Sequence, residues 1–334
     1  MKVLKFGGTS VGSAQRMKEV AKLITDGERK IVVLSAMSGT TNTLVEISDY
    51  LYKKNPEGAN EIINRLESKY RQHIDELFAT PEYKQKGLEL IKSHFDYIRS
   101  YTKDLFTLFE EKVVLAQGEL ISTAMMNYYL QECGVKSVLL PALEYMRTDK
   151  NAEPDPVYIK DKLQVQLELH PDAEIYITQG YICRNAYGEI DNLQRGGSDY
   201  TASLIGAAIN ASEIQIWTDI DGMHNNDPRI VDKTAPVRHL HFEEAAELAY
   251  FGAKILPPTC IQPAKYANIP VRLLNTMDPT APGTLISNDT EKGKIKAVAA
   301  KDNITAIKIK SSRMLLAHGF LRKVFEIFES YQTS

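Results

Sequence analysis

The sequence predicts an α/β protein, a three-layer αβα sandwich in which helices cover both faces of a mostly parallel sheet. Short β-rich runs alternate with helical patterns along most of the 334 residues, which is the order that favours a parallel sheet. Several of these runs are apolar at consecutive positions, as expected for strands buried on both faces. The hydrophobic content of 43% allows a substantial core.

The predicted strands are short and spread along the chain. They are Val3–Phe6, Ile31–Ser35, Ser137–Leu140, Ile175–Tyr181, Ile214–Thr218 and Val271–Leu273. Between the first two strands, apolar residues at helical spacing mark one buried face, namely Met17, Val20, Ala21 and Ile24. Residues 60–111 are rich in charge and aromatics, with Gly87 as their one glycine, and we expect a helical hairpin there.

A proline-rich turn at residues 278–283 predicts a boundary, with a catalytic domain at 1–286 and a linker and smaller module at 287–334. The tail predicts a strand at Ile304–Ile309. It also predicts a helix whose apolar face carries Leu321, Val324, Phe325 and Phe328. One strand and one helix are about half of a small α+β module, which is too little to bury a core of its own.

The composition argues against several classes of protein. A net charge of −3 and a pI near 6.2 indicate no basic face for nucleic acid or an anionic membrane. No run of about 18 apolar residues or signal-peptide pattern is present. The cysteines Cys133, Cys183 and Cys260 are far apart, which favours neither disulfides nor zinc, and we expect no metal ligands from protein side chains. These features predict a cytoplasmic protein.

Two glycine-rich loops lie nearly two hundred residues apart. One is Lys5-Phe6-Gly7-Gly8-Thr9-Ser10, and the other is Arg195-Gly196-Gly197-Ser198-Asp199. Each follows an extended stretch and precedes a helical pattern. Paired glycines let backbone N–H groups approach an anion closely, and the N-terminus of a helix favours negative charge. The two loops together predict a site that holds a polyphosphate from two sides.

The charged residues of these loops each allow two interpretations. Lys5 is either an edge-strand lysine in solvent or an ammonium aimed at a transferring phosphoryl group, and the adjacent glycines favour the second. Asp199 either caps a helix or orients lysines or a metal, and the two roles are compatible. Arg195 could bind a carboxylate through two parallel hydrogen bonds.

Four further segments are weaker signals. The segment from Trp217 to Arg229 has a strand ending in Thr-Asp followed by an Asp-Gly turn, and Phe251–Lys254 places a lysine after a glycine in a helical stretch. Ser35–Thr41 is rich in hydroxyl groups. Gln117-Gly118-Glu119 is expected to open a helix, where a glutamate is commonly favoured by the helix dipole alone. A Walker loop, the His-Arg-Asp loop of protein kinases and a dinucleotide fingerprint are all missing.

Taken in order, the six segments resemble the aspartate kinase branch of the amino acid kinase family over residues 1–286. The tail from Ser311 to Glu329 resembles the start of that branch's regulatory ACT module, most of which is missing. In detail the chain is closer to members in which the kinase precedes homoserine dehydrogenase. The resemblance implies the amino acid kinase fold and a homodimer. Members of the family are inhibited by lysine or threonine through paired ACT modules, and because only a fragment of that apparatus is present here, we expect little response to either amino acid.

The resemblance also implies the reaction and the residues that perform it. MgATP would phosphorylate the side-chain carboxylate of L-aspartate to 4-phospho-L-aspartate, the first step toward lysine, threonine and methionine. The residues implied for catalysis are Lys5, Asp199 and Lys254; those for ATP are Lys5, Gly7, Gly8, Ser10, Thr218, Asp219, His224, Arg229 and Lys254; and those for aspartate are Ser35, Thr41, Glu119, Arg195, Gly196, Gly197 and Ser198. The family usually has tyrosine where His224 stands, and Pro257-Pro258 also departs from its pattern.

Two other functions remain open from the sequence. The first is another amino acid kinase, acting on glutamate, acetylglutamate, carbamate or UMP. The Arg195 loop and the Glu119 segment favour aspartate over these acceptors. The second is a catalytically inactive sensor of amino acids, which the retention of Lys5 and Asp199 disfavours. A carboxylate acceptor with a pKa of about 3.9 is already ionised at neutral pH, so the absence of an obvious general base is consistent with a kinase.

Overall fold

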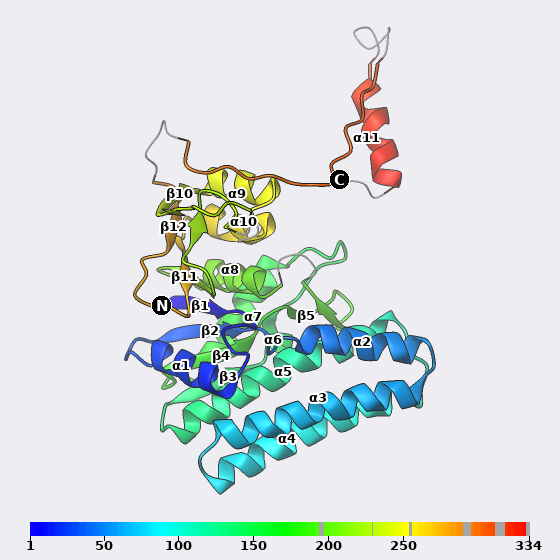
Figure 1. Cartoon of the computed structure of the whole chain (residues 1–334), viewed down its shortest axis with the longest axis vertical. Coiled ribbons are helices and arrows are strands. Elements are labelled where there is room, and N and C mark those ends of the chain that lie inside the picture. The colour runs from blue at the N-terminus through cyan, green and yellow to red at the C-terminus, as the bar shows by residue number, and fades with distance from the viewer. Residues whose placement is uncertain (194–196, 229, 254–255, 290–294, 311–317, 332–334) are drawn as a thin grey trace. The chain divides into compact units, whose positions relative to one another are not determined.

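The computed structural model describes residues 1–193, 197–228, 230–253, 256–289, 295–310 and 318–331. The chain divides into two compact units, Met1–Ala300 and Lys301–Ser334. The first unit contains a large sheet with helices on both faces (Figure 1). The predicted division after residue 286 stays a prediction.

The central sheet of the first unit has eight strands in the order β10-β12-β11-β7-β1-β2-β4-β3 within the described residues. Six neighbouring strands, from β11 to β3, run parallel, and β12 runs antiparallel to β11. All six predicted strands form, with ends that move by no more than two residues. The sheet strands are β1 (Lys2–Phe6), β2 (Lys30–Leu34), β3 (Ser137–Leu140), β4 (Ile175–Gln179), β7 (Ile214–Thr218), β10 (His239–His241), β11 (Val271–Asn275) and β12 (Thr284–Ser287). Two small hairpins pair β5 (Ile182–Arg184) with β6 (Ile190–Asn192), and β8 (Met223–His224) with β9 (Pro236–Val237).

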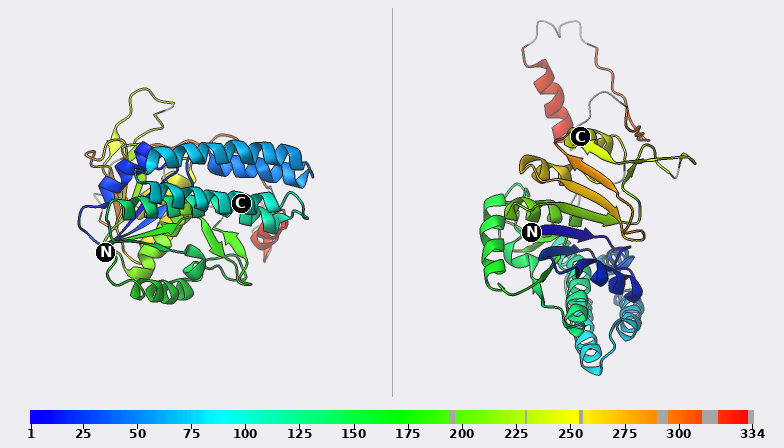
Figure 2. Two further views of the ribbon diagram at one scale, coloured as in Figure 1. Left: turned by 90° about the horizontal axis from the view of Figure 1, so that it is seen from below. Right: turned by 90° about the vertical axis from the view of Figure 1, so that its left-hand side faces the viewer.

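Helices cover the two faces of the sheet and complete the predicted three-layer sandwich (Figure 2). One apolar core joins Leu4 and Phe6 of β1 to the first group of helices. A second core joins Val3 and Ile31 to the other group. The first group is α1 (Ala14–Ile24), α2 (Thr40–Tyr52), α3 (Pro56–Leu77), α4 (Pro81–Ser100) and α5 (Leu108–Glu132); the second is α6 (Ala142–Tyr145), α7 (Pro156–Glu168), α8 (Gly197–Ile209), α9 (Phe242–Tyr250) and α10 (Pro258–Tyr266).

The predicted helical excursion is confirmed as the antiparallel pair α3 and α4, followed by the long helix α5 (Figure 1). Each of these helices begins at a side chain that satisfies free backbone N–H groups. The Asn55 side chain accepts a hydrogen bond from Gly58 N–H, and Thr80 caps α4. Thr107 and Glu110 form a reciprocal capping box at the start of α5.

The second unit contains the predicted helix, α11 (Phe320–Ser330), but the predicted strand at Ile304–Ile309 is wrong. A strand is stable only when its backbone groups pair with a neighbour, and no described segment pairs with residues 304–309. The apolar face of α11 is also uncovered within this unit, since Leu321 and Phe325 are each 65% exposed. None of the described helices combines the length and apolar character that a membrane crossing requires.

Candidate active site

The predicted site residues gather where the parallel strands end. Because β1, β2, β4, β7 and β11 run in one direction, their carboxyl ends meet at one edge of the sheet. Ser35 directly follows β2, Gly180 follows β4, and Thr276 follows β11. Ligands of open α/β sheets bind at this edge.

Lys5 and Asp199 form an ion pair at the end of β1. Side chains alternate along a strand, and because Val3 packs in the core on the α8 side, Lys5 faces α8 as well. Asp199 lies in the first turn of α8, and its Oδ1 is 2.7 Å from Lys5 Nζ. The two side chains are 10% and 17% exposed. The pair therefore fixes an ammonium group at the edge where the glycine-rich loop begins.

The Gly7–Gly8 loop is pressed between this lysine and the next loop of the sheet. A Cβ atom at Gly7 would lie 3.4 Å from Lys5 Nζ, and one at Gly8 would lie 2.9 Å from the carbonyl oxygen of Ala36. Ser38 N–H donates a hydrogen bond of 3.1 Å to the Gly8 carbonyl. Glycine is required at position 8 because that neighbour is backbone and cannot rotate away. The loop is further fixed by a 2.8 Å hydrogen bond between the hydroxyls of Ser10 and Thr276.

Ser35 and Ser198 join β2 to the start of α8. The Ser35 hydroxyl donates a hydrogen bond of 2.9 Å to Ser198 Oγ. A Cβ at Gly180 would lie only 2.2 Å from Ser198 Oγ, so a glycine after β4 allows α8 to approach the sheet. Consecutive residues of α8 thus contact the ends of two neighbouring strands.

Glu119 is a buried carboxyl group on the other side of this edge. The residue is 4% exposed, and its Oε1 accepts a hydrogen bond of 3.2 Å from Ala36 N–H. Oε2 is buried without a hydrogen-bond partner among the described residues. Burial raises the pKa of this carboxyl to about 7. No described cation balances its charge.

The predicted position of Glu119 in a first helical turn is wrong, because the residue lies in the middle of the 25-residue helix α5. The sequence signal was Gly118, which resembles a helix boundary. The structure gives this glycine a different role. A Cβ at Gly118 would lie 2.8 Å from Ala36 Cβ, so its absence lets α5 approach the loop after β2.

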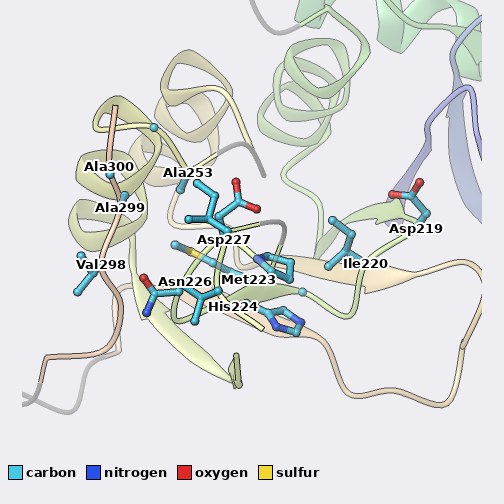
Figure 3. A pocket seen from close by; sticks show the side chains of 15 residues that line it. Asp219, Ile220, Met223, His224, Asn226, Asp227, Ala253, Val298, Ala299 and Ala300 are labelled. Carbon is cyan, nitrogen blue, oxygen red and sulfur yellow. The ribbon is translucent and has the colours of Figure 1, made fainter. Parts of the chain in front are cut away.

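A pocket of about 400 Å³ lies beyond the end of β7 (Figure 3). Asp219 and His224, both predicted for the nucleotide, contribute to its wall, and Thr218 ends the adjoining strand. His224 Nδ1 is 2.8 Å from Thr234 Oγ1. Most of the other lining residues are apolar, and Asn226 and Asp227 are the polar ones among those named here. They include Ile220, Gly222, Met223, Asn226, Asp227, Ile230, Val231, Ala253, Val298, Ala299 and Ala300.

The remaining predicted residues fall into two groups, those outside the described residues and those whose backbone is described. Arg195, Gly196, Arg229 and Lys254 lie outside the described residues. Gly197 opens α8 with a φ of +46°, and Thr41 is partly buried in the first turn of α2. Phe251–Ala253, predicted as helical, follow the end of α9, where Gly252 adopts a φ of +117°. This left-handed backbone is incompatible with a continuing helix.

Sequence reasoning missed three contributors. Gly180 and Thr276 each follow a parallel strand directly, and inspection of that position after every predicted strand would have found both. Residues 298–300 carry no motif. Among the described residues, no group of three or more histidine, cysteine, aspartate and glutamate side chains could hold a metal ion.

Comparison with known proteins identifies the family. The profile of the amino acid kinase family matches residues 1–275. Aspartokinase 1 of Arabidopsis thaliana, a chloroplastic protein, is 38% identical over 98% of this chain and 59% of its own length. Lysine-sensitive aspartokinase 3 of Escherichia coli is 34% identical over 99% of the chain and 74% of its own length. The crystal structure of E. coli aspartokinase III with aspartate and ADP matches with a TM-score of 0.85 and 31% identity, covering 100% of this chain and 75% of that one.

The chain matches only part of the length of these relatives. The chain spans about three fifths of the length of the plant aspartokinases, 59% to 62% of each. A bifunctional aspartokinase/homoserine dehydrogenase of Arabidopsis thaliana is 29% identical, so these identities do not favour the expected likeness to bifunctional chains. With a family profile over most of its length and an E. coli aspartokinase matched over nearly all of it, the chain belongs to the amino acid kinase family, in its aspartokinase branch.

Proposed function

We propose that this chain transfers the γ-phosphoryl group of ATP to the side-chain carboxylate of L-aspartate, forming 4-phospho-L-aspartate and ADP. The observation that carries the proposal is the Lys5–Asp199 ion pair beside the Gly7–Gly8 loop. It supports a kinase because phosphoryl transfer requires fixed positive charge and backbone N–H groups at the transferring group. The aspartokinase relatives support aspartate as the acceptor.

The proposed reaction requires little proton transfer. A carboxylate oxygen of aspartate attacks the γ-phosphorus, the bond to the bridging oxygen of ADP breaks, and ADP leaves with that electron pair. The acceptor is ionised at neutral pH, because its pKa is about 3.9. Lys5 would neutralise charge on the transferring group, and Asp199 would hold the Lys5 ammonium in position. Lys254 is proposed as a second phosphate contact.

Glu119 is proposed to bind the ammonium group of aspartate. Its Oε2 is buried and lacks a hydrogen-bond donor among the described residues. An ammonium group at this position would supply both the missing donor and the missing positive charge. Arg195 would bind a carboxylate of aspartate, and hydrogen bonds would come from the loops that carry Ser35, Thr41 and Gly196 to Ser198.

ATP would lie between the glycine-rich loop and the pocket beyond β7. Gly7, Gly8 and Ser10 would contact phosphates, and Thr218, Asp219, His224 and Arg229 would line the rest of the nucleotide. The donor set fits a magnesium ion that is held mainly by the phosphates, since Mg²⁺ in such sites retains waters and few protein ligands. When bound, the ion would neutralise phosphate charge. We also propose a homodimer and a cytoplasmic location.

The test is aspartate-dependent formation of a hydroxamate from MgATP and hydroxylamine, because hydroxylamine attacks an acyl phosphate and releases phosphate. We expect hydroxamate with aspartate and none with glutamate or acetylglutamate. Product formed only with one of the other acceptors would identify a different amino acid kinase. Binding of ATP and aspartate without turnover would instead favour the sensor function.

A further inference from the structure

A segment beyond the family match forms part of the nucleotide pocket. The amino acid kinase profile ends at residue 275, yet Val298, Ala299 and Ala300 line the same pocket as Asp219 and His224 (Figure 3). These three residues lie after β12, near the end of the first compact unit. We call them the 298–300 wall.

Two contacts fix this wall against the first unit. Lys296 Nζ is 2.8 Å from Glu244 Oε2, and the two side chains are 16% and 37% exposed. Glu244 is itself held, because Oε2 accepts a hydrogen bond of 2.8 Å from His241 N–H at the start of α9. Val298 N–H donates a hydrogen bond of 2.9 Å to the carbonyl of Asn225, just after β8. The wall is therefore attached to two elements that border the pocket.

The pocket has two chemically different sides. Asp219 follows β7, which pairs with β1 so that Trp217 lies beside Phe6. This side is therefore next to the glycine-rich loop and Lys5. In Figure 3 the 298–300 wall lies on the opposite side from Asp219. Its side chains are a valine and two alanines, which offer no charge to a phosphate and suit a flat apolar ring.

We propose that the 298–300 wall binds the purine base of the nucleotide. This inference rests on the proposed function, which puts the phosphates at the glycine-rich loop. A nucleotide with its phosphates there and its remainder in the pocket has its base against Val298 and Ala299. The volume of about 400 Å³ is in the range of ligand pockets and accommodates a nucleoside. The wall lies beyond residue 275, where the match to the family profile ends.

The test compares two tryptophan substitutions on the same segment. Ala299→Trp fills the base side of the pocket, whereas Ile295→Trp replaces a side chain that is 92% exposed and does not line the pocket. We measure dissociation constants for ADP and for adenosine by calorimetry, with the full chain. We expect Ala299→Trp to weaken ADP and adenosine by similar factors of about tenfold or more, a loss of at least ~1.4 kcal/mol. Ile295→Trp should leave both unchanged, and circular dichroism checks that both variants fold.

Equal ADP affinity in the two variants would overturn the proposal. A loss for ADP without a loss for adenosine would also overturn it, because the wall would then act on the phosphates. Hydroxamate formation by the unsubstituted chain separates this result from the proposed function. If that activity is present and Ala299→Trp binds ADP normally, the proposal about the wall is contradicted and the proposed function is not. If that activity is missing while Ala299→Trp weakens the binding of both ADP and adenosine, the proposed reaction is contradicted and the proposal about the wall is supported.

Discussion

The two ends of the candidate site differ in how their charge is balanced. At the phosphoryl end, the Asp199 carboxylate already contacts a cation, Lys5, within the protein. At the amino-acid end, the Glu119 carboxyl is more deeply buried, and no described cation lies against it. Its pKa is correspondingly raised to about 7 by burial. The Asp199 carboxylate is therefore already paired within the protein, whereas we propose that the Glu119 carboxyl obtains its positive charge from the substrate.

The comparison predicts that removing charge at the phosphoryl end has the largest effect. Lys5→Ala should lower kcat by at least about hundredfold, because a fixed charge that acts on the transition state is lost. Lys22→Ala, at an exposed lysine on α1, is the matched control and should retain full activity. Steady-state kinetics measures both. A kcat near that of the unsubstituted chain would remove Lys5 from the reaction.

The second prediction addresses the amino-acid end. Glu119→Gln should raise KM for aspartate by about tenfold or more, because a hydrogen bond to a charged group contributes roughly 1.5–3 kcal/mol. The dissociation constant of ADP should not change. Glu111→Gln, on the same helix, is the control. If ADP binding weakened as much as aspartate binding, the two ends would not be separate in function.

The third prediction uses the pKa of Glu119. The carboxyl must be ionised to bind an ammonium group, and with a pKa of about 7 it is mostly protonated at pH 6 and mostly ionised at pH 8. The affinity for aspartate should therefore rise about five- to tenfold from pH 6 to pH 8, as the ionised fraction increases. Calorimetry at several pH values measures it. A rise of the same size in Glu119→Gln would assign the titration to another group.

The smallest predicted effect on kinetics is that of Ser35→Ala, at the hydrogen bond between the loop after β2 and the first turn of α8. Ser35→Ala removes the hydrogen bond to Ser198, which contributes about 1 kcal/mol if typical. We expect a two- to fivefold increase in KM for aspartate and a smaller change for ATP, in the same kinetic assay. A larger effect on ATP than on aspartate would show that Ser35 serves the phosphoryl end.

The sequence predicted the sheet well because its signals were local. Apolar runs such as Ile31–Ser35 identify buried strands, and the glycines after β1 mark a loop that requires close backbone approach. The helical hairpin was likewise readable from composition and spacing. The side of the sheet that Lys5 faces also follows from the sequence, because side chains alternate between the two faces of β1.

The errors arose where a distant partner decides the structure. Residues 304–309 have the composition of a strand, but a strand forms only beside another one, and the described chain supplies none. Gly118 resembled the start of a helix, although the absence of a side chain at this position allows Ala36, in the loop after β2, to pack closely against α5. Residues 298–300 contain no recognisable pattern, and only the folded chain brings them to the pocket.

The first turn of α8 contacts residues at both ends of the candidate site. Ser198 contacts Ser35 and the next residue, Asp199, contacts Lys5, so one rigid turn touches both ends of the site. A ligand that shifts this turn changes the free energy of binding at both places. By thermodynamic linkage, the factor by which aspartate alters the affinity for ADP must equal the factor by which ADP alters the affinity for aspartate. We therefore expect a ligand at one end of the site to alter the affinity at the other end through this single helical turn.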